Sequence, residues 1–74
     1  MTNTSKLHQL TLDWGHSDPI DLIEEYTFDG VMPAICMNDD CDYSTEYEPD
    51  QTEGWCEHCA TNTVQSAAIL AGVI

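Results

Sequence analysis

Four cysteines in two close pairs constrain this chain more than any other feature of its sequence. Four residues separate Cys36 from Cys41, two separate Cys56 from Cys59, and fourteen lie between the pairs. Two short loops that each offer two thiolates can close a tetrahedral shell around one metal ion. The spacing therefore predicts one structural Zn²⁺ bound by Cys36, Cys41, Cys56 and Cys59.

The length of the chain explains why such a site would matter. Its 74 residues form one domain at most, and so short a chain buries too little surface to be stable by a wide margin. A structural zinc ion contributes roughly 10–16 kcal/mol of apparent binding energy, which in small metal-binding domains is folding energy. We therefore expect a fold that depends on its metal.

Zinc has two rivals that the sequence leaves open. Four cysteines also hold iron in rubredoxin-like sites, but those normally use two C-x2-C loops, whereas Asn38, Asp39 and Asp40 lengthen the first loop here. The other rival is a disulfide pair. Disulfides are disfavoured in the cytosol, where thiols stay reduced. We expect a cytoplasmic protein because the polar first residues lack the apolar segment and cleavage site of a signal peptide.

A catalytic role for the metal is not expected. Catalytic zinc keeps one position open for water and usually includes His or carboxylate ligands, whereas four thiolates close the shell. His58, within the second cysteine loop, is expected to be exposed, as are His8 and His16. No nucleophile–base pair or phosphate-binding loop is recognisable. We therefore predict that the protein is not an enzyme and has no catalytic residues.

The expected fold class is a small metal-stabilised α+β domain over residues 17–74, preceded by a polar tail over residues 1–16 without a clear helical period. A short helix is predicted to begin at Asp18 and Pro19, because Asp18 can cap free N–H groups and Pro19 suits the first helical position. Residues 27–30 should end it, with Gly30 in a left-handed conformation. Its buried side is expected to contain Ile20, Ile23 and Tyr26.

Short antiparallel strands are expected around the cysteine pairs. Residues 31–35 form an extended run into the first pair, and residues 42–48 alternate in the manner of a half-buried strand. Pro49 and Asp50 open a turn, and Gly54 relaxes the backbone before the second pair. The aromatic residues expected to pack around the metal are Tyr43, Tyr47 and Trp55, with Trp14 and Phe28 covering them from outside.

The apolar C-terminal segment fits two structures. Its alanine content favours a helix over residues 65–72 with Gly72 near the end. The spacing of Val64, Ser66 and Ala68 equally fits a strand. The run from Ile69 to Ile74 could also support a homodimer, and it is far too short to cross a bilayer.

The charge of the chain limits its partners. Fourteen acidic residues face a single basic one, Lys6, which gives a formal charge of −13. Nucleic-acid affinity comes mainly from Lys and Arg on phosphates, so direct nucleic-acid binding and binding to anionic membranes are not expected. The acidic run over residues 38–42 lacks the alternating pattern of a calcium loop and is interpreted as a solvated turn.

The two cysteine loops with strands between them resemble a zinc ribbon, although the C-x4-C loop departs from the usual C-x2-C. Over residues 30–74 the segments ICMNDDC, EPDQ, GWCEHC and TNTVQS resemble small uncharacterised acidic zinc-ribbon proteins of bacteria and their phages. This resemblance implies a compact zinc-binding protein and supplies no activity.

Three functional interpretations of the acidic surface stay open. The first, which we favour, is a protein–protein interaction or adaptor module that docks on a basic partner, with charge guiding the encounter and exposed aromatic groups adding affinity. The second is an inhibitor that imitates nucleic acid. In the third, the carboxylates serve solubility and have no specific partner.

Overall fold

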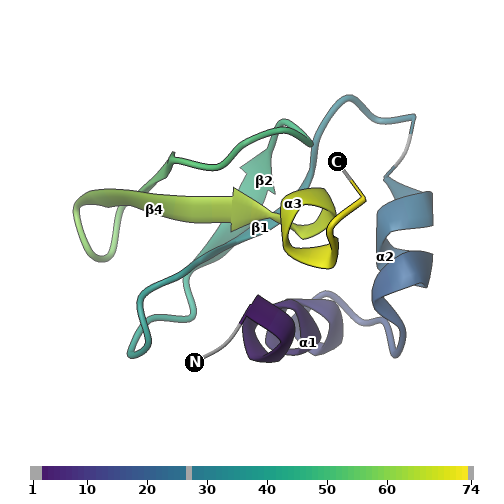
Figure 1. The fold of residues 1–74 in the computed structure, drawn as a ribbon, viewed down its shortest axis with the longest axis horizontal. Coiled ribbons are helices and arrows are strands. Elements are labelled where there is room, and N and C mark those ends of the chain that lie inside the picture. The colour runs from purple at the N-terminus through teal and green to yellow at the C-terminus, as the bar shows by residue number, and fades with distance from the viewer. Residues whose placement is uncertain (1–2, 27, 74) are drawn as a thin grey trace.

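The computed structural model describes residues 3–26 and 28–73 and places helices at one end of a four-stranded antiparallel sheet (Figure 1). The strand order is β2-β1-β4-β3. In chain order the elements are α1 (Asn3–Asp13), α2 (Pro19–Glu25), β1 (Met32–Cys36), β2 (Ser44–Tyr47), β3 (Gly54–Cys56), β4 (Thr61–Ser66) and α3 (Ala67–Ala71). The α+β fold class is confirmed at this level.

Strand β1 is the centre of the molecule, and all five of its residues are buried. It pairs with β2, where Met32 lies opposite Tyr47, and with β4, where Cys36 lies opposite Val64. Strand β3 pairs only with β4 and carries Cys56. The sheet therefore brings the ends of β1 and β3, with one cysteine each, to the two sides of β4.

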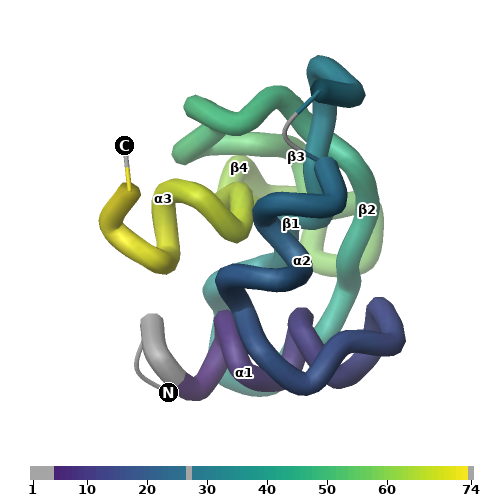
Figure 2. The backbone as a smooth tube through the Cα atoms, turned by 90° about the vertical axis from the view of Figure 1, so that its right-hand side faces the viewer, coloured from purple at the N-terminus to yellow at the C-terminus, as the bar shows by residue number. Residues whose placement is uncertain are grey.

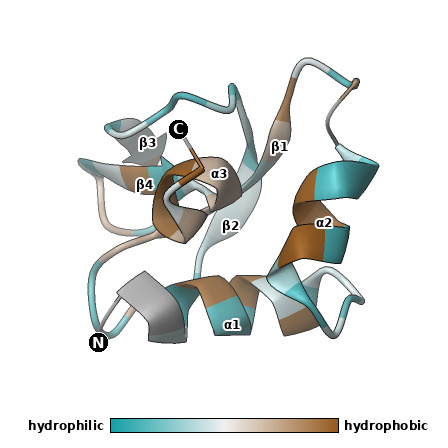
Figure 3. Ribbon diagram, turned by 45° about the vertical axis from the view of Figure 1, so that its right-hand side comes forward, coloured by the Kyte–Doolittle hydropathy of each residue, from teal (hydrophilic) through white to brown (hydrophobic). Residues whose placement is uncertain are grey.

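The buried side chains form two clusters, one beneath the helices and one around the cysteines. The helix cluster joins all three helices to β1 and consists of Leu7, Leu10, Leu22, Met32, Ile35, Ala67, Ala68 and Leu70. The cysteine cluster consists of Ala34, Cys36, Cys41, Cys56 and Val64. Figure 3 shows the hydrophobic side of α2 turned toward α3 and its hydrophilic side turned away. Three of the five members of the second cluster are thiols, so ordinary apolar packing is sparse there.

Residues 3–16 are not part of the polar tail that the sequence suggested, because most of them form helix α1. Helix α1 contributes Leu7 and Leu10 to the helix cluster, and it lies beside α3 and β1 (Figure 2). Lys6 and Thr11 share this buried face. The four positions form one helical face, but two of them are polar, which hides the 3.6-residue period in the sequence. The Thr11 hydroxyl is satisfied within the helix by donating to the Leu7 carbonyl at 2.7 Å.

The start of α2 is confirmed, and its buried face contains two of the three expected residues, Ile23 and Tyr26, together with Leu22. The Asp18 carboxylate accepts a hydrogen bond from the Ile20 N–H at 2.9 Å, and Pro19 opens the helix. Leu22 is the fully buried residue, whereas Ile20 is half exposed and Ile23 and Tyr26 are partly buried. Gly30 has the expected positive φ of 77°. Thr27, part of the predicted helix end, lies outside the described residues.

The expected strands are present, and Gly54 has a different role from the predicted one. A side chain at Gly54 would place its Cβ 2.8 Å from the ring of Tyr47, which reaches from β2 to the backbone of β3 and donates its hydroxyl to the Trp55 carbonyl, so the position favours glycine. Tyr43 and Tyr47 pack against the cysteine cluster as predicted. Trp55 is 47% exposed and Phe28 is 96% exposed, so neither covers the site. Trp14 packs instead on the helix cluster, edge-to-face with Tyr26.

The C-terminal segment adopts both structures that its sequence allows. Residues up to Ser66 form β4, and α3 then runs to Ala71. The Ser66 hydroxyl caps α3 by accepting from the Ile69 N–H at 3.2 Å. Gly72 ends the helix at φ 74°, as expected. Ile74, the last residue of the segment proposed for dimerisation, lies outside the described part of the chain.

Within residues 3–26 and 28–73, the structure contains no helix with the length and apolar character needed to cross a membrane.

Candidate metal centre

The fold brings the four cysteines of the two pairs to one point. Cys36 ends β1 and Cys56 ends β3, while Cys41 and Cys59 lie in the loops that follow. All four sulfurs lie within 4.8 Å of one another. The close contacts cross between the pairs, because Cys36 Sγ is 3.9 Å from Cys59 Sγ and Cys41 Sγ is 3.7 Å from Cys56 Sγ. The predicted clustering of these side chains is confirmed.

The spacing of the sulfurs fits a tetrahedral ion and not a disulfide. A Zn–S bond of about 2.3 Å places the four sulfurs of a tetrahedron about 3.8 Å apart, close to the two contacts above. A disulfide needs an S–S distance of about 2.05 Å, and all four cysteines are free. The cluster could therefore hold one metal ion with four sulfur ligands.

Hydrogen bonds from the two loops reach the sulfurs. The Cys59 N–H donates to Cys56 Sγ at 3.3 Å, and the Thr63 hydroxyl lies 3.1 Å from Cys36 Sγ. Backbone N–H groups of Asn38 and Tyr43 act in the same way on Cys36 and Cys41. Such contacts orient thiolate ligands and disperse their negative charge. The Thr63 hydroxyl comes from β4, and the sequence gave no indication of its contact with Cys36.

The surroundings give the thiols of Cys36 and Cys41 different pKa values. Burial alone would raise the pKa of Cys36, but hydrogen bonds from Thr63, the Asn38 N–H and the thiols of Cys56 and Cys41 lower it to about 7. Burial raises the pKa of Cys41 to about 12, which the neighbouring thiols reinforce. The Cys36 thiolate therefore forms more readily than the Cys41 thiolate.

His58 lies at the edge of the site without being one of the four clustered groups. It is exposed, as expected, yet its Nδ1 is 3.4 Å from Cys41 Sγ. This places the imidazole beside a sulfur as a hydrogen-bond partner. Elsewhere, His8 is exposed, and His16 Nε2 lies 2.6 Å from a carboxylate oxygen of Glu25, away from the cysteines.

Lys6 contacts the site although the sequence placed it in a tail. Its side chain is fully buried, and its ammonium donates to the carbonyls of Asn38 at 2.6 Å and Cys41 at 2.5 Å. Both acceptors belong to the C-x4-C loop. A lone lysine in a polar segment carries no pattern that identifies such a role, so sequence reasoning missed it.

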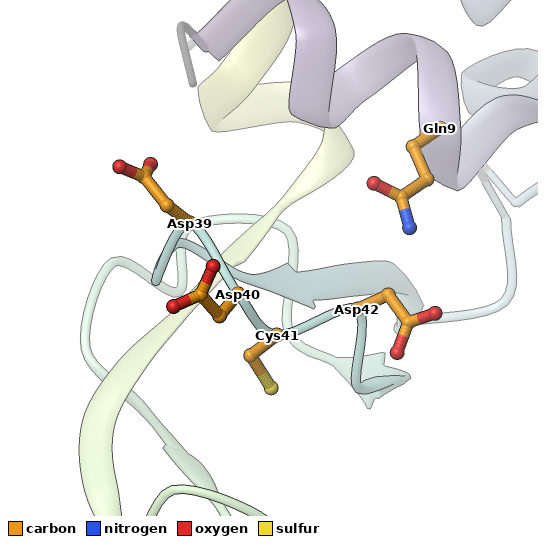
Figure 4. A pocket seen from close by; sticks show the side chains of 5 residues that line it. All are labelled: Gln9, Asp39, Asp40, Cys41 and Asp42. Atoms are coloured by element: carbon orange, nitrogen blue, oxygen red, sulfur yellow. The ribbon is translucent and has the colours of Figure 1, made fainter.

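The acidic loop beside the site is hollowed but does not form a second cation cage. Figure 4 shows Gln9 and the loop side chains around a hollow of about 230 Å³. The carboxylates of Asp39 and Asp42 point to opposite sides in this view, and Asp40 is also exposed. Carboxylates that point apart do not provide the converging oxygens that Ca²⁺ requires. This agrees with the interpretation as a solvated acidic turn.

The fold also makes the surface more acidic than the composition implies. All fourteen carboxylate side chains are exposed, whereas Lys6, the chain's single Lys or Arg, is 0% exposed. The solvated surface thus carries the negative side chains without a lysine or arginine among them. Electrostatic complementarity would favour a positively charged partner.

Comparison with known proteins gives no relatives: no family model, no curated protein and no solved structure matches the chain. The resemblance to small zinc-ribbon proteins of bacteria and phages therefore stays a prediction that rests on sequence segments.

Proposed function

We propose that this protein is a small zinc-ribbon module that binds one structural Zn²⁺ through Cys36, Cys41, Cys56 and Cys59 and docks on a basic partner protein in the cytoplasm. The metal part of the proposal is carried by four sulfurs within 4.8 Å of one another at tetrahedral spacing. Thiolate ligands suit zinc, and the deviation of the first loop from C-x2-C disfavours the rubredoxin-like alternative.

Four sulfur ligands leave no open coordination position, so the ion would act on folding and not on a substrate. Bound zinc would tie the ends of β1 and β3 together and keep the cysteine cluster compact. The role of the protein would then be non-enzymatic, with the surface as its working part.

The metal proposal is tested by elemental analysis and native mass spectrometry of the purified chain. One zinc per chain is expected, and the Cys59→Ser variant should lose it together with folded structure. The matched control is Glu57→Gln, which changes an exposed side chain of the same loop but no proposed ligand, and it should keep one zinc. Stoichiometric iron, or a wild-type chain without metal that stays folded, would contradict the proposal.

Docking on a basic surface is supported by the separation of charge in the fold. Fourteen exposed carboxylates and one buried lysine give a surface that repels nucleic acid and attracts cationic proteins. Trp55 and Phe28, at 47% and 96% exposure, supply the aromatic groups that commonly anchor such contacts. A Trp face also binds Lys or Arg through its π-system.

Affinity capture from a bacterial lysate, followed by salt elution, tests the docking function. A partner with a basic surface should be retained at about 50 mM salt and released by a few hundred millimolar, since screening weakens exposed charge pairs. Trp55→Ala should weaken retention, and Leu12→Ala, at a comparably exposed apolar residue, serves as the control. Retention that salt does not change would refute a charge-guided partner.

The same carboxylate-only surface supports a second candidate, an inhibitor that imitates nucleic acid. A captured partner would then bind DNA or RNA, and the nucleic acid would displace the protein in competition. Binding that persists at saturating nucleic acid would favour the adaptor role instead.

A further inference from the structure

We propose that Lys6 is a positioning residue of the metal centre, whose buried ammonium holds the C-x4-C loop in the shape that lets Cys36 and Cys41 reach one ion. This inference rests on the zinc site proposed above. It adds to that site Lys6 of helix α1, a residue that lies 35 positions before Cys41 in the sequence.

The contacts of the ammonium span the loop. Lys6 Nζ donates to the Asn38 carbonyl at 2.6 Å and to the Cys41 carbonyl at 2.5 Å. The Asn38 carbonyl also accepts from the Cys41 N–H at 3.1 Å. One group on α1 therefore fixes the beginning and the end of the turn that carries Cys41.

The shorter loop shows why the longer one needs such help. In the C-x2-C loop, the Cys59 N–H donates to Cys56 Sγ at 3.3 Å and the Ala60 N–H donates to the Cys56 carbonyl at 2.8 Å. Those bonds lie within the loop itself. The C-x4-C loop has the comparable internal bond from the Cys41 N–H to the Asn38 carbonyl, but it has two more residues to order, and the Asn38 and Cys41 carbonyls are also held by a side chain from another element.

Charge supports the same assignment. A fully buried ammonium is costly unless negative groups lie nearby, and four thiolates around a divalent ion carry two net negative charges. The chain has no other lysine and no arginine, and the single one it has is placed against the cysteine loop. Bound metal would therefore stabilise the docking of α1, and docked α1 would raise the affinity for metal.

Metal binding by Lys6→Met, with Co²⁺ as the probe, tests this role. The variant keeps a long apolar side chain and removes the ammonium. We expect it to bind Co²⁺ roughly tenfold or more weakly than wild type in chelator competition, because two charge-assisted hydrogen bonds are lost. Its d–d spectrum at saturating Co²⁺ should also change, since the loop that carries Cys41 is no longer held.

Two variants of the same helix separate positioning from simple helix docking. His8→Gln changes an exposed side chain and should match wild type in affinity and spectrum. Leu10→Ala weakens the packing of α1 but keeps the ammonium, so at saturation its Co²⁺ spectrum should be that of wild type. The proposal is also supported if, at saturating Co²⁺, the Leu10→Ala variant folds and the Lys6→Met variant does not.

The proposal is overturned if Lys6→Met keeps wild-type affinity and spectrum. It is equally overturned if Lys6→Met and Leu10→Ala behave alike, whether both fold or neither does, since Lys6 would then only dock the helix. A wild-type chain that binds no metal in the elemental analysis would remove the zinc site itself, and that result is distinct from these.

Discussion

Removing the metal under reducing conditions should unfold this protein, and the two clusters of buried side chains show why. Apart from its cysteines, the cysteine cluster contains only Ala34 and Val64 as buried members. In the helix cluster, α2 has seven residues and α3 has five, too short to be stable without tertiary packing. Each part of the fold therefore depends on the sheet that the metal would hold together.

The magnitudes favour complete unfolding over local loosening. A chain of 74 residues has a net stability of about 4–11 kcal/mol at roughly 0.05–0.15 kcal/mol per residue. The apparent binding energy of a structural zinc ion is roughly 10–16 kcal/mol. Because the second quantity equals or exceeds the first, the metal-free chain should populate mainly the unfolded state.

The assay is a ¹H–¹⁵N correlation spectrum with reductant and an excess of chelator, followed by addition of Zn²⁺ or, as the control, Mg²⁺. We expect collapsed amide dispersion without metal, full recovery with Zn²⁺ and none with Mg²⁺. A dispersed spectrum of the reduced, metal-free chain, with slow exchange of the β1 and β4 amides, would refute this reasoning.

Three further predictions follow from single features of the fold. Leu10→Ala should lower the free energy of unfolding by about 2–5 kcal/mol, because the Leu10 side chain is fully buried. The control Leu12→Ala changes an exposed side chain of the same helix and should cost under about 0.5 kcal/mol. Equal losses for the two variants in urea titrations would mean that α1 does not pack on the core. Ala60→Gly should raise the free energy of unfolding by about 1 kcal/mol in the same titrations, because Ala60 adopts a φ of 57°, which is strained for a residue with a Cβ. A lower free energy of unfolding in the variant would contradict this prediction. Metal affinity should fall as pH decreases below 7, because protons compete with the metal for the thiolates and the pKa of Cys36 is about 7. An affinity that does not change between pH 6 and 8 in chelator competition would argue against thiolate ligands.

The sequence predicted best what depends on neighbouring residues. The Asp18 cap, the turn at Pro49 and the left-handed Gly30 are all local choices of the backbone, and each is present. The cysteine spacing predicted the cluster because a thiolate loop needs only a few residues to present two sulfurs. That the cluster binds an ion, and that this ion is Zn²⁺, stay predictions.

Sequence reasoning failed where a polar residue is buried or an apolar one is exposed. Helix α1 was missed because half of its buried face is polar, and that face becomes recognisable only when Lys6 meets the carbonyls of a distant loop. Trp55 was expected to pack around the metal and Phe28 to cover that packing from outside, yet both are exposed. Burial is a property of the assembled fold, and side-chain chemistry gives it only on average.

The sequence by itself determined that the chain is acidic, short and equipped with two thiolate loops, because these are matters of composition and local spacing. The folded chain added that the close sulfur contacts cross between the two pairs, that the lone lysine contacts one of the loops and that every carboxylate is exposed. The physical reason is that convergence and burial arise from contacts between segments far apart in the chain, which are set when β1 pairs with β4 and α1 packs on β1.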